Sequence, residues 1–204
     1  IVVDLQGAQT ESRYRGIGRY SLSFTRALLQ HSSEHEFWVI LNGRFTEAID
    51  FIEGQLADVL PRSRIRVFDA PSNIAKRTTS STQMAAAAEI IREAFLADLE
   101  PDLVLITSLF EGYLDDAVTS IGLLSDVRVP TAVVHYDLIP AVREGYINST
   151  EYAEFYQGKL ASLKRADLLL AISEHSRSEV VGFLDLPADR VINISAAVDE
   201  RFRE

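Results

Sequence analysis

The sequence predicts an α/β protein built on a Rossmann-like, doubly wound parallel sheet of about seven strands. Short apolar runs alternate with amphipathic segments along all 204 residues. The apolar runs are rich in Val, Ile and Leu and are apolar on both faces, as the strands of a parallel sheet covered on both sides must be. Repeated alternation of strand and helix therefore favours a doubly wound sheet.

Seven segments have the pattern of strands: residues 1–5, 36–41, 65–68, 102–107, 131–136, 168–172 and 190–194. Between them, apolar residues recur at helical spacing, so that each helix has one face to bury. The clearest sets are Ile17, Tyr20, Phe24, Ala27 and Leu28; Met84, Ala88, Ile91 and Phe95; and Tyr152, Phe155, Tyr156, Leu160 and Leu163. With no repeat and no linker, residues 1–204 are expected to form one domain, with a mobile loop at 70–81.

The amino-acid composition excludes several classes of function. The chain has 20 Lys and Arg against 30 Asp and Glu, a net charge of −10, and no basic block. Nucleic acid is therefore not an expected partner, because its binding depends on neutralising phosphates. Cysteine is absent, which excludes disulfides and thiolate metal sites. The chain opens inside an apolar strand without a signal peptide, so we expect a cytoplasmic location and further residues upstream.

A glycine pair lies between the first predicted strand and the first predicted helix. The segment Gly16-Ile17-Gly18-Arg19 offers backbone N–H groups at a helix start, which bind phosphate or carboxylate. Glycine also permits unusual φ values and close backbone approach. A flexible turn with surface arginines is the alternative interpretation. The segment is not the dinucleotide fingerprint, because Ser21 stands at the third glycine position, the second strand ends without an acid and the connection is longer than a Rossmann turn.

The fifth predicted strand, 131–136, ends in the most informative side chains. His135, Tyr136 and Asp137 place an imidazole, a phenol and a carboxylate at the edge where open α/β sheets bind ligands. Adjacent strand residues point to opposite faces, so His135 and Tyr136 cannot both face a cleft if the strand is regular. Asp137 is the favoured ligand-binding residue. The histidine is either a general base or hydrogen-bond partner, or a satisfied core residue.

Two other strand ends carry single polar candidates. Glu111, beside Gly112, is suited to accept hydrogen bonds from sugar hydroxyls; the alternative is a helix cap or an exposed loop acid. Ser173 follows the sixth strand and is expected first of all to cap the next helix, although it lies on the ligand-binding edge. The four histidines show no shared metal spacing, so no metal site is expected.

Together these segments resemble the N-terminal half of a family 4 glycosyltransferase, and therefore one half of a GT-B fold. The resemblance covers nearly the whole chain, and its main segments are Gly16-Ile17-Gly18-Arg19-Tyr20, Ser108-Leu109-Phe110-Glu111-Gly112, Tyr136-Asp137-Leu138-Ile139-Pro140 and Ala166-Asp167 with Ser173-Glu174-His175-Ser176-Arg177. Residues 191–202, with Val198-Asp199, resemble the connection to a second domain. The most similar branch contains bacterial mannosyltransferase-like enzymes that build surface polysaccharides.

The resemblance implies that residues 1–204 are a single N-terminal, acceptor-side domain, and that the C-terminal nucleotide-sugar domain is absent from this chain. Such enzymes transfer a sugar, here expected to be mannose, from a nucleotide diphosphate to a glycan or lipid-linked acceptor with retention of configuration. The nucleotide sugar is a co-substrate, and no cofactor or metal is implied. The family's basic pair and E-x7-E acids lie in the second half, so this chain is expected to be inactive alone. Peripheral association of the parent with the inner face of the membrane is compatible with this picture.

The same resemblance suggests roles for individual residues. The donor diphosphate would be held by the glycine segment, that is by Gly16, Ile17, Gly18 and Arg19. Asp137, with His135 or Tyr136, would form the catalytic group that contacts the transferred sugar or the acceptor, and Glu111 and Ser173 would bind acceptor or sugar. Many relatives read His-Asp-Leu-Ile-Pro, which places Tyr136 in the histidine position and His135 one residue early.

Two other functions stay open from the sequence. One is the Rossmann domain of an NAD(P)-dependent oxidoreductase, against which the missing third glycine and the missing strand-two acid count. The other is a non-catalytic module that binds a sugar or a partner protein.

Overall fold

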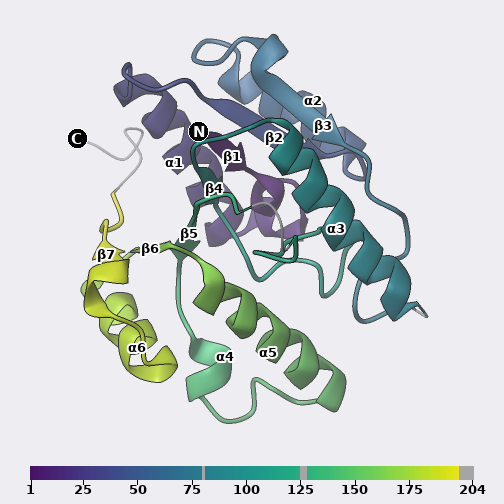
Figure 1. Ribbon diagram of the computed structural model, residues 1–204, viewed down its shortest axis with the longest axis vertical. Coiled ribbons are helices and arrows are strands. Elements are labelled where there is room, and N and C mark those ends of the chain that lie inside the picture. The colour runs from purple at the N-terminus through teal and green to yellow at the C-terminus, as the bar shows by residue number, and fades with distance from the viewer. Residues whose placement is uncertain (80, 125–127, 198–204) are drawn as a thin grey trace.

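The computed structural model describes residues 1–79, 81–124 and 128–197, in which helices surround a central sheet (Figure 1). Seven parallel strands lie in the order β3-β2-β1-β4-β5-β6-β7. They are β1 Val2–Asp4, β2 Trp38–Asn42, β3 Ile65–Phe68, β4 Val104–Ile106, β5 Thr131–His135, β6 Leu168–Ala171 and β7 Val191–Asn193. The order runs outward from β1 and β4 in both directions, which confirms the predicted doubly wound, Rossmann-like α/β fold.

The connections between strands contain the predicted helices. The predicted face of the helix at 82–98 is only partly correct, because Met84 and Ile91 are exposed and its buried residues are Ala88, Arg92 and Leu96. The α-helices are α1 Gly16–His31, α2 Thr46–Leu56, α3 Thr82–Asp98, α4 Ile139–Val142, α5 Thr150–Arg165 and α6 Glu174–Leu184. Four short 3-10 helices are also present: η1 Gln6–Ala8 and η2 Glu11–Tyr14 precede α1, and η3 Arg62–Arg64 and η4 Ala188–Arg190 precede β3 and β7. No strand–helix connection was predicted to contain helical turns, so η1 and η2, which fill the long connection after β1, are additions to the predicted fold.

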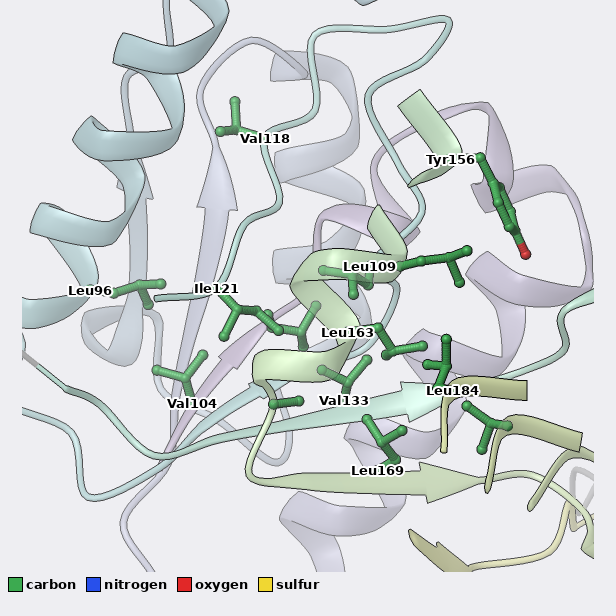
Figure 2. Close-up of a cluster of buried hydrophobic side chains, with 14 of the residues drawn as sticks. Leu96, Val104, Leu109, Val118, Ile121, Val133, Tyr156, Leu163, Leu169 and Leu184 are labelled. Atoms are coloured by element: carbon green, nitrogen blue, oxygen red, sulfur yellow. The ribbon is translucent and has the colours of Figure 1, made fainter. Parts of the chain in front are cut away.

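The helices cover the two faces of the sheet in two groups. On one face, α3, α5 and α6 contribute Leu96, Leu163 and Leu184 to one buried cluster (Figure 2). On the other face, α2 contributes Ile52 to a second cluster, and α1 packs against it through the half-buried Phe24. The sheet is therefore sandwiched between two hydrophobic cores.

Successive residues of one strand enter opposite cores. In β5, Val133 belongs to the first cluster and Val134 to the second. In β1, Val2 and Val3 divide in the same way. Each buried methylene contributes roughly 0.8 kcal/mol, so both faces of every central strand gain from apolar side chains. This explains why the strands read as continuous apolar runs instead of alternating ones.

Serine side chains fix the starts of three helices. Ser81, Ser149 and Ser173 each accept a hydrogen bond from the backbone N–H three residues ahead, at 3.2, 3.1 and 3.1 Å. A serine cap is typically worth about 1 kcal/mol relative to alanine. The capping role predicted for Ser173 is thus present, and α6 starts directly after the sixth strand.

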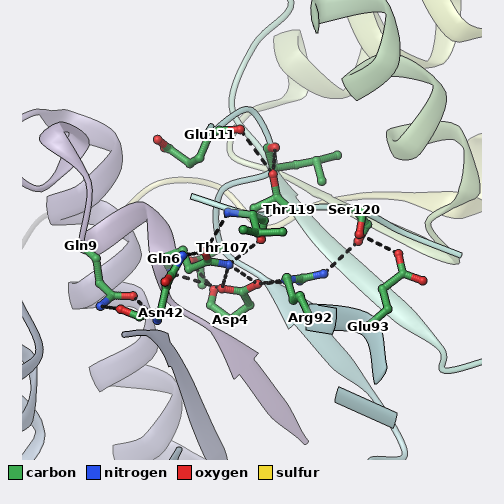
Figure 3. A network of polar contacts seen from close by, with 12 residues as sticks. Asp4, Gln6, Gln9, Asn42, Arg92, Glu93, Thr107, Glu111, Thr119 and Ser120 are labelled. Atoms are coloured by element: carbon green, nitrogen blue, oxygen red, sulfur yellow. Dashed lines mark hydrogen bonds and ion pairs between the residues drawn. The ribbon is translucent and has the colours of Figure 1, made fainter. Parts of the chain in front are cut away.

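A buried polar network lies beneath the carboxyl ends of the central strands (Figure 3). Arg92 of α3 is fully buried and donates to Asp4 from Nε at 2.8 Å and from Nη2 at 2.5 Å. Its Nη1 donates to the carbonyl of Ser120 at 3.0 Å. Gln6 donates to the Asp4 carboxylate and to the carbonyl of Val118, and accepts from the Val118 N–H. One carboxylate therefore joins α3, the end of β1 and the segment around residue 119.

The end of β2 is joined to the same network. Gln9 and the backbone of Asn42 exchange two hydrogen bonds, at 2.7 and 3.1 Å. The Asn42 side chain donates to Gln6 Oε1 and to the carbonyl of Asp116, and accepts from the N–H of Arg44. Both polar atoms of this side chain are therefore engaged within the protein.

The loop predicted over 70–81 is present, but its described part is held in place. The Asp116 carboxylate accepts from the N–H groups of Asn73, Ile74 and Ala75 at 3.0, 2.8 and 3.0 Å. The side chains of Ile74 and Ala75 are buried. Three hydrogen bonds and two buried side chains thus fix a segment that its polar sequence suggested would be mobile.

Within residues 1–79, 81–124 and 128–197, every helix is too short or too polar to cross a lipid bilayer. The Val198-Asp199 pair, which the sequence related to a connection between domains, lies outside the described residues.

Replacing Arg92 by Met should lower the free energy of unfolding by about 3–5 kcal/mol, because it leaves the buried Asp4 carboxylate without its cation. Chemical denaturation at pH 7 measures the change. The control is Arg62→Met, since the Arg62 side chain in the ion pair with Glu53 is 80% exposed and such pairs contribute little. Equal losses in the two variants would contradict a special role for the buried pair.

Candidate functional site

The carboxyl ends of β1, β4, β5 and β6 meet at one edge of the sheet, and the candidate segments follow these strand ends. The glycine segment comes after β1, Glu111 after β4, Asp137 after β5 and Ser173 after β6. The parallel register aligns the ends of neighbouring strands, for example Asp4 with Ile106. The structure therefore brings the four segments to the ligand-binding edge of the fold.

The two glycines of the first segment have different surroundings. A Cβ on Gly18 would lie 2.5 Å from Arg13 Cα, so η2 packs directly against the start of α1. A Cβ on Gly16 would meet nothing within 4 Å. Neither glycine has a positive φ. Close approach at Gly18, and not an unusual backbone conformation, is thus the physical reason for glycine in this segment.

The start of α1 is open to an anion. Its N-cap residue, Arg15, makes no capping hydrogen bond through its side chain, and Gly16 is exposed. The first N–H groups of a helix have no partner within the helix and lie at its positive end. The exposed side chains of Arg15 and Arg19 add positive charge at the same place. A phosphate or a carboxylate would be stabilised there.

Tyr136 joins this helix start to the sheet. Its hydroxyl lies 3.1 Å from Ser21 Oγ, 3.1 Å from the carbonyl oxygen of Thr107 and 3.4 Å from that of Ile17. Its ring meets Tyr20 edge-on, with centroids 5.6 Å apart. Burial raises the pKa of Tyr136 above its ordinary value of 10, so the phenol keeps its proton. In this arrangement the side chain holds α1 against the ends of β4 and β5.

His135 lies on the opposite side of the strand from Tyr136, as the strand alternation predicted. Its side chain is only 2% exposed, whereas Tyr136 packs against the second core. Burial lowers the pKa of His135 to about 4, although the nearby Asp137 carboxylate acts in the opposite direction. The imidazole is therefore neutral at pH 7. Its Nε2 is buried without a hydrogen-bond partner in the described part of the chain.

Of His135, Tyr136 and Asp137, only Asp137 is exposed. Its Oδ1 accepts from the N–H of Ile139 at 3.0 Å, which shapes the turn into α4. The residue as a whole is exposed to solvent. Behind the turn, the N–H of Leu138 donates to Glu179 of α6 at 2.9 Å. Asp137 is thus a fixed and accessible acceptor for hydroxyl groups.

Glu111 is held within the protein instead. Its side chain is buried, and the hydroxyls of Thr10, Ser12 and Ser108 donate to its carboxylate at 3.0, 3.4 and 2.8 Å. Burial raises the pKa of Glu111, against the lowering effect of these hydrogen bonds. The protein's own hydroxyls therefore take the positions expected for sugar hydroxyls, and the carboxylate connects the β1–α1 connection to the end of β4.

Ser173 likewise uses its hydroxyl internally. Besides capping α6, its Oγ lies 3.0 Å from Ser176 Oγ, and Ser176 donates to the carbonyl of Tyr136 at 2.6 Å. The pair of serines therefore joins the end of β5 to the start of α6.

Several residues of the site were not predicted from the sequence. Thr10 and Ser12 were not singled out, although both are hydroxyl residues in a connection that is unusually long. Gly7 was also missed: a Cβ there would lie 2.5 Å from Ser108 Cβ, so glycine allows η1 to approach the end of β4. These contacts join residues about one hundred positions apart, and no local pattern indicates them.

A cavity of about 300 Å³ opens beside this cluster, between the β1–α1 connection and the end of β2. Its lining includes Thr10, Arg13, Arg44 and Asp115. Burial raises the pKa of Asp115. Another cavity, of about 380 Å³, lies at the amino ends of β4 and β5, away from the candidate residues. Among the residues that the structure describes, no group of three or more Asp, Glu or His side chains is placed to hold a metal ion.

The fold and this edge define the class of protein: a Rossmann-like half of a GT-B-type fold. Solved structures agree with this class. A UDP-N-acetylglucosamine 2-epimerase superposes with a TM-score of 0.56 and 17% identity, over 93% of this chain and 44% of the epimerase. The UDP-GlcNAc 2-epimerase from Neisseria meningitidis, bound to UDP-GlcNAc, gives 0.53 and 15% over 94% and 44%. At these identities the likeness concerns the fold alone.

The sequence comparison is more specific. The chain is 36% identical over 204 residues, 99% of its length, to a serotype-specific mannosyltransferase WbdA of Escherichia coli, of which it covers 24%. A second WbdA of Escherichia coli is 35% identical over 180 residues, with 87% of this chain and 22% of the relative covered. The chain thus spans about a quarter of the length of the curated relatives it matches. No protein-family profile matches it. The chain is homologous to a segment of these glycosyltransferases, which confirms the resemblance seen in its motifs.

The two glycines should respond differently to substitution. Gly18→Ala should destabilise the fold by about 1–3 kcal/mol, because the new Cβ would overlap the backbone of η2. Gly16→Ala should leave stability nearly unchanged, because its Cβ would enter open space. Urea denaturation of both variants measures the difference. A neutral Gly18→Ala would show that η2 does not pack as described.

Glu111 should make stability depend on pH. Because its pKa is raised in the folded protein above the ordinary 4.5, the unfolded chain loses the proton first, so folding stability falls as pH rises from 4.5 towards the folded-state pKa. Glu111→Gln removes this contribution. The free energy of unfolding of the variant, relative to wild type, should therefore increase between pH 4 and pH 7 in a denaturation series. A constant difference would contradict the raised pKa.

Proposed function

We propose that this chain is the N-terminal, acceptor-side domain of a retaining glycosyltransferase. The enzyme would move mannose from a nucleotide-diphosphate sugar to a glycan or lipid-linked acceptor during synthesis of a surface polysaccharide. The observation that carries the proposal is the 36% identity with a mannosyltransferase along 99% of this chain. The domain that holds most of the nucleotide sugar would lie in the part of the parent protein outside this chain.

The start of α1 supports a role in stabilising the leaving diphosphate. Transfer of the sugar places negative charge on that group, and preorganised donors aimed at such charge are commonly the largest catalytic contribution. The uncapped N–H groups at Gly16, Ile17 and Gly18 supply such donors. Arg19 is exposed beside them. The open space at Gly16 would let the phosphate approach the backbone closely.

The end of β5 supports a role in contacting the sugar or the acceptor. Asp137 offers an exposed carboxylate for hydroxyl groups. A neutral His135, with its pKa near 4, would act as a hydrogen-bond partner and not as a cation. Tyr136 would position the helix that binds the diphosphate, through its contacts with Ser21 and Ile17. Glu111 would act in a similar way, through its contacts with the β1–α1 connection.

The oxidoreductase alternative finds less support. A dinucleotide site needs an acid at the end of the second strand to bind the ribose hydroxyls. That position is Asn42, and its side chain is already bonded to Gln6, Asp116 and the N–H of Arg44. The residue is therefore both of the wrong type and already engaged.

In the full-length parent protein, Asp137→Ala should lower kcat/KM for sugar transfer on the order of 10²-fold, as loss of one positioned polar group typically does. Gly16→Val should also lower it, because the side chain would cover the helix start. Transfer of mannose from a nucleotide-diphosphate mannose to a glycan acceptor, followed by mass spectrometry, measures both effects.

The matched control is Gly182→Val, at an exposed glycine of α6 with equally open surroundings. It should transfer sugar like the wild type. Undiminished transfer by both Asp137→Ala and Gly16→Val would refute the proposed function.

A further inference from the structure

A cavity of about 400 Å³ lies where β5, β6 and β7 begin, at the opposite edge of the sheet from the candidate functional site. Four of its six lining residues are basic and one is acidic, in a chain whose net charge is −10. The basic residues are Arg128, Lys164, Arg165 and Arg190, and the acidic residue is Asp167. They come from three separate segments, so folding concentrates positive charge that the sequence does not show as a basic block.

Stabilisation of α5 accounts for part of this charge. Lys164 and Arg165 lie in the last turn of α5, where cations interact favourably with the helix dipole. Arg190 donates from Nη2 to the carbonyl of Lys164 at 2.9 Å and also to that of Ala166, so it caps the helix end. The end of a helix carries only about half a negative charge, however, and Asp167 adds one more. The four basic side chains therefore supply more positive charge than the helix end and Asp167 neutralise.

Three of the basic side chains are held in position by hydrogen bonds. Arg128 pairs with Asp167, and Arg165 donates from Nη1 to the carbonyl of Ile121 at 3.2 Å. The acceptors of Arg165 and Arg190 are neutral carbonyls, so both guanidinium groups keep their full charge. Among the described residues, each of these two groups bonds through one nitrogen. A guanidinium has five N–H donors in a planar fork, so the same side chains have donors to offer a ligand.

An oxoanion with several oxygens is the ligand that suits this lining. Guanidinium groups bind phosphate oxygens in a bidentate way, and the exposed ammonium of Lys164 adds a mobile point charge. Ala166, the one uncharged lining residue that the structure describes, is buried. The cavity therefore offers charge and hydrogen-bond donors to a ligand, and little apolar surface.

We infer that this cavity, here termed the basic cavity, is a binding site for a phosphate monoester or diphosphate group. The site is separate from the start of α1, because the two lie at opposite edges of the sheet, and it does not depend on the proposed sugar transfer. Free phosphates in solution and the headgroup of an anionic lipid present the same chemistry, and the experiment distinguishes these two sources.

The test is isothermal titration calorimetry of inorganic pyrophosphate into this chain at low salt. All samples carry Gly16→Val, which covers the start of α1 and so isolates the basic cavity. The chain should bind one pyrophosphate. Replacing both Lys164 and Arg165 by Gln should weaken binding about tenfold or more, because it removes two charge-assisted contacts. Lys164→Gln alone should weaken it about threefold.

The matched control replaces Arg62 and Arg64 by Gln, in η3 before β3, at the other lateral edge of the sheet. It removes the same charge from side chains that are 80% and 41% exposed, and should bind pyrophosphate like the unsubstituted chain. Thermal unfolding of each sample shows that the variants are folded. If the basic residues only stabilise α5, the melting temperature falls while the affinity stays constant. That result, equal affinities in the two double variants, or no binding of pyrophosphate would each overturn the inference.

Cosedimentation with vesicles identifies the source of the phosphate. If the source is a lipid, the chain should sediment with phosphatidylcholine vesicles that contain phosphatidic acid but not with phosphatidylcholine alone, and replacing Lys164 and Arg165 should abolish this. Binding of pyrophosphate without sedimentation assigns the basic cavity to a soluble phosphate. Sedimentation that persists in the double variant would show that another surface contacts the lipid, and would overturn the lipid assignment.

Discussion

The carboxylate of Asp4 is the contact on which the ligand-binding edge depends. Asp4 is the last residue of the central strand β1, and its carboxylate is buried together with the guanidinium of Arg92. A carboxylate in such a place is tolerated only with a cation and a full set of donors, so α3, Gln6 and the segment around Ser120 must all meet it in one geometry. The same edge of the sheet carries the η1 turn, the hydroxyls around Glu111 and the start of α1.

The sequence was sufficient for the sheet and for the order of the candidate segments, because strand apolarity, helix periodicity and serine caps are local patterns. It was also sufficient to predict that His135 and Tyr136 diverge, since this follows from strand geometry. It was not sufficient for Glu111, whose environment is made by residues such as Thr10, 101 positions away. Arg92 is a similar case: an arginine within a predicted helix reads as a surface residue, and only its partner 88 positions away explains its complete burial.

The loop after β3 is a further case in which local sequence was not sufficient, here because it suggested mobility where the structure shows order. Its proline, serines and threonines are typical of a mobile segment. The carboxylate of Asp116 nevertheless supplies three hydrogen bonds to its backbone. Local composition describes what a segment would do in isolation, whereas order in the folded chain is decided by an acceptor from another loop.

The division between buried and exposed polar groups at this edge has a consequence for how such proteins diversify. The groups that maintain the edge, among them Asp4, Arg92 and Glu111, are enclosed and interdependent. Those that face solvent, such as Asp137, Arg19 and Arg44, make few contacts with the rest of the chain. Mutation can therefore change the outer residues one at a time while the inner ones stay constant. An edge organised in this way would let related chains acquire different substrate preferences without first having to gain stability elsewhere.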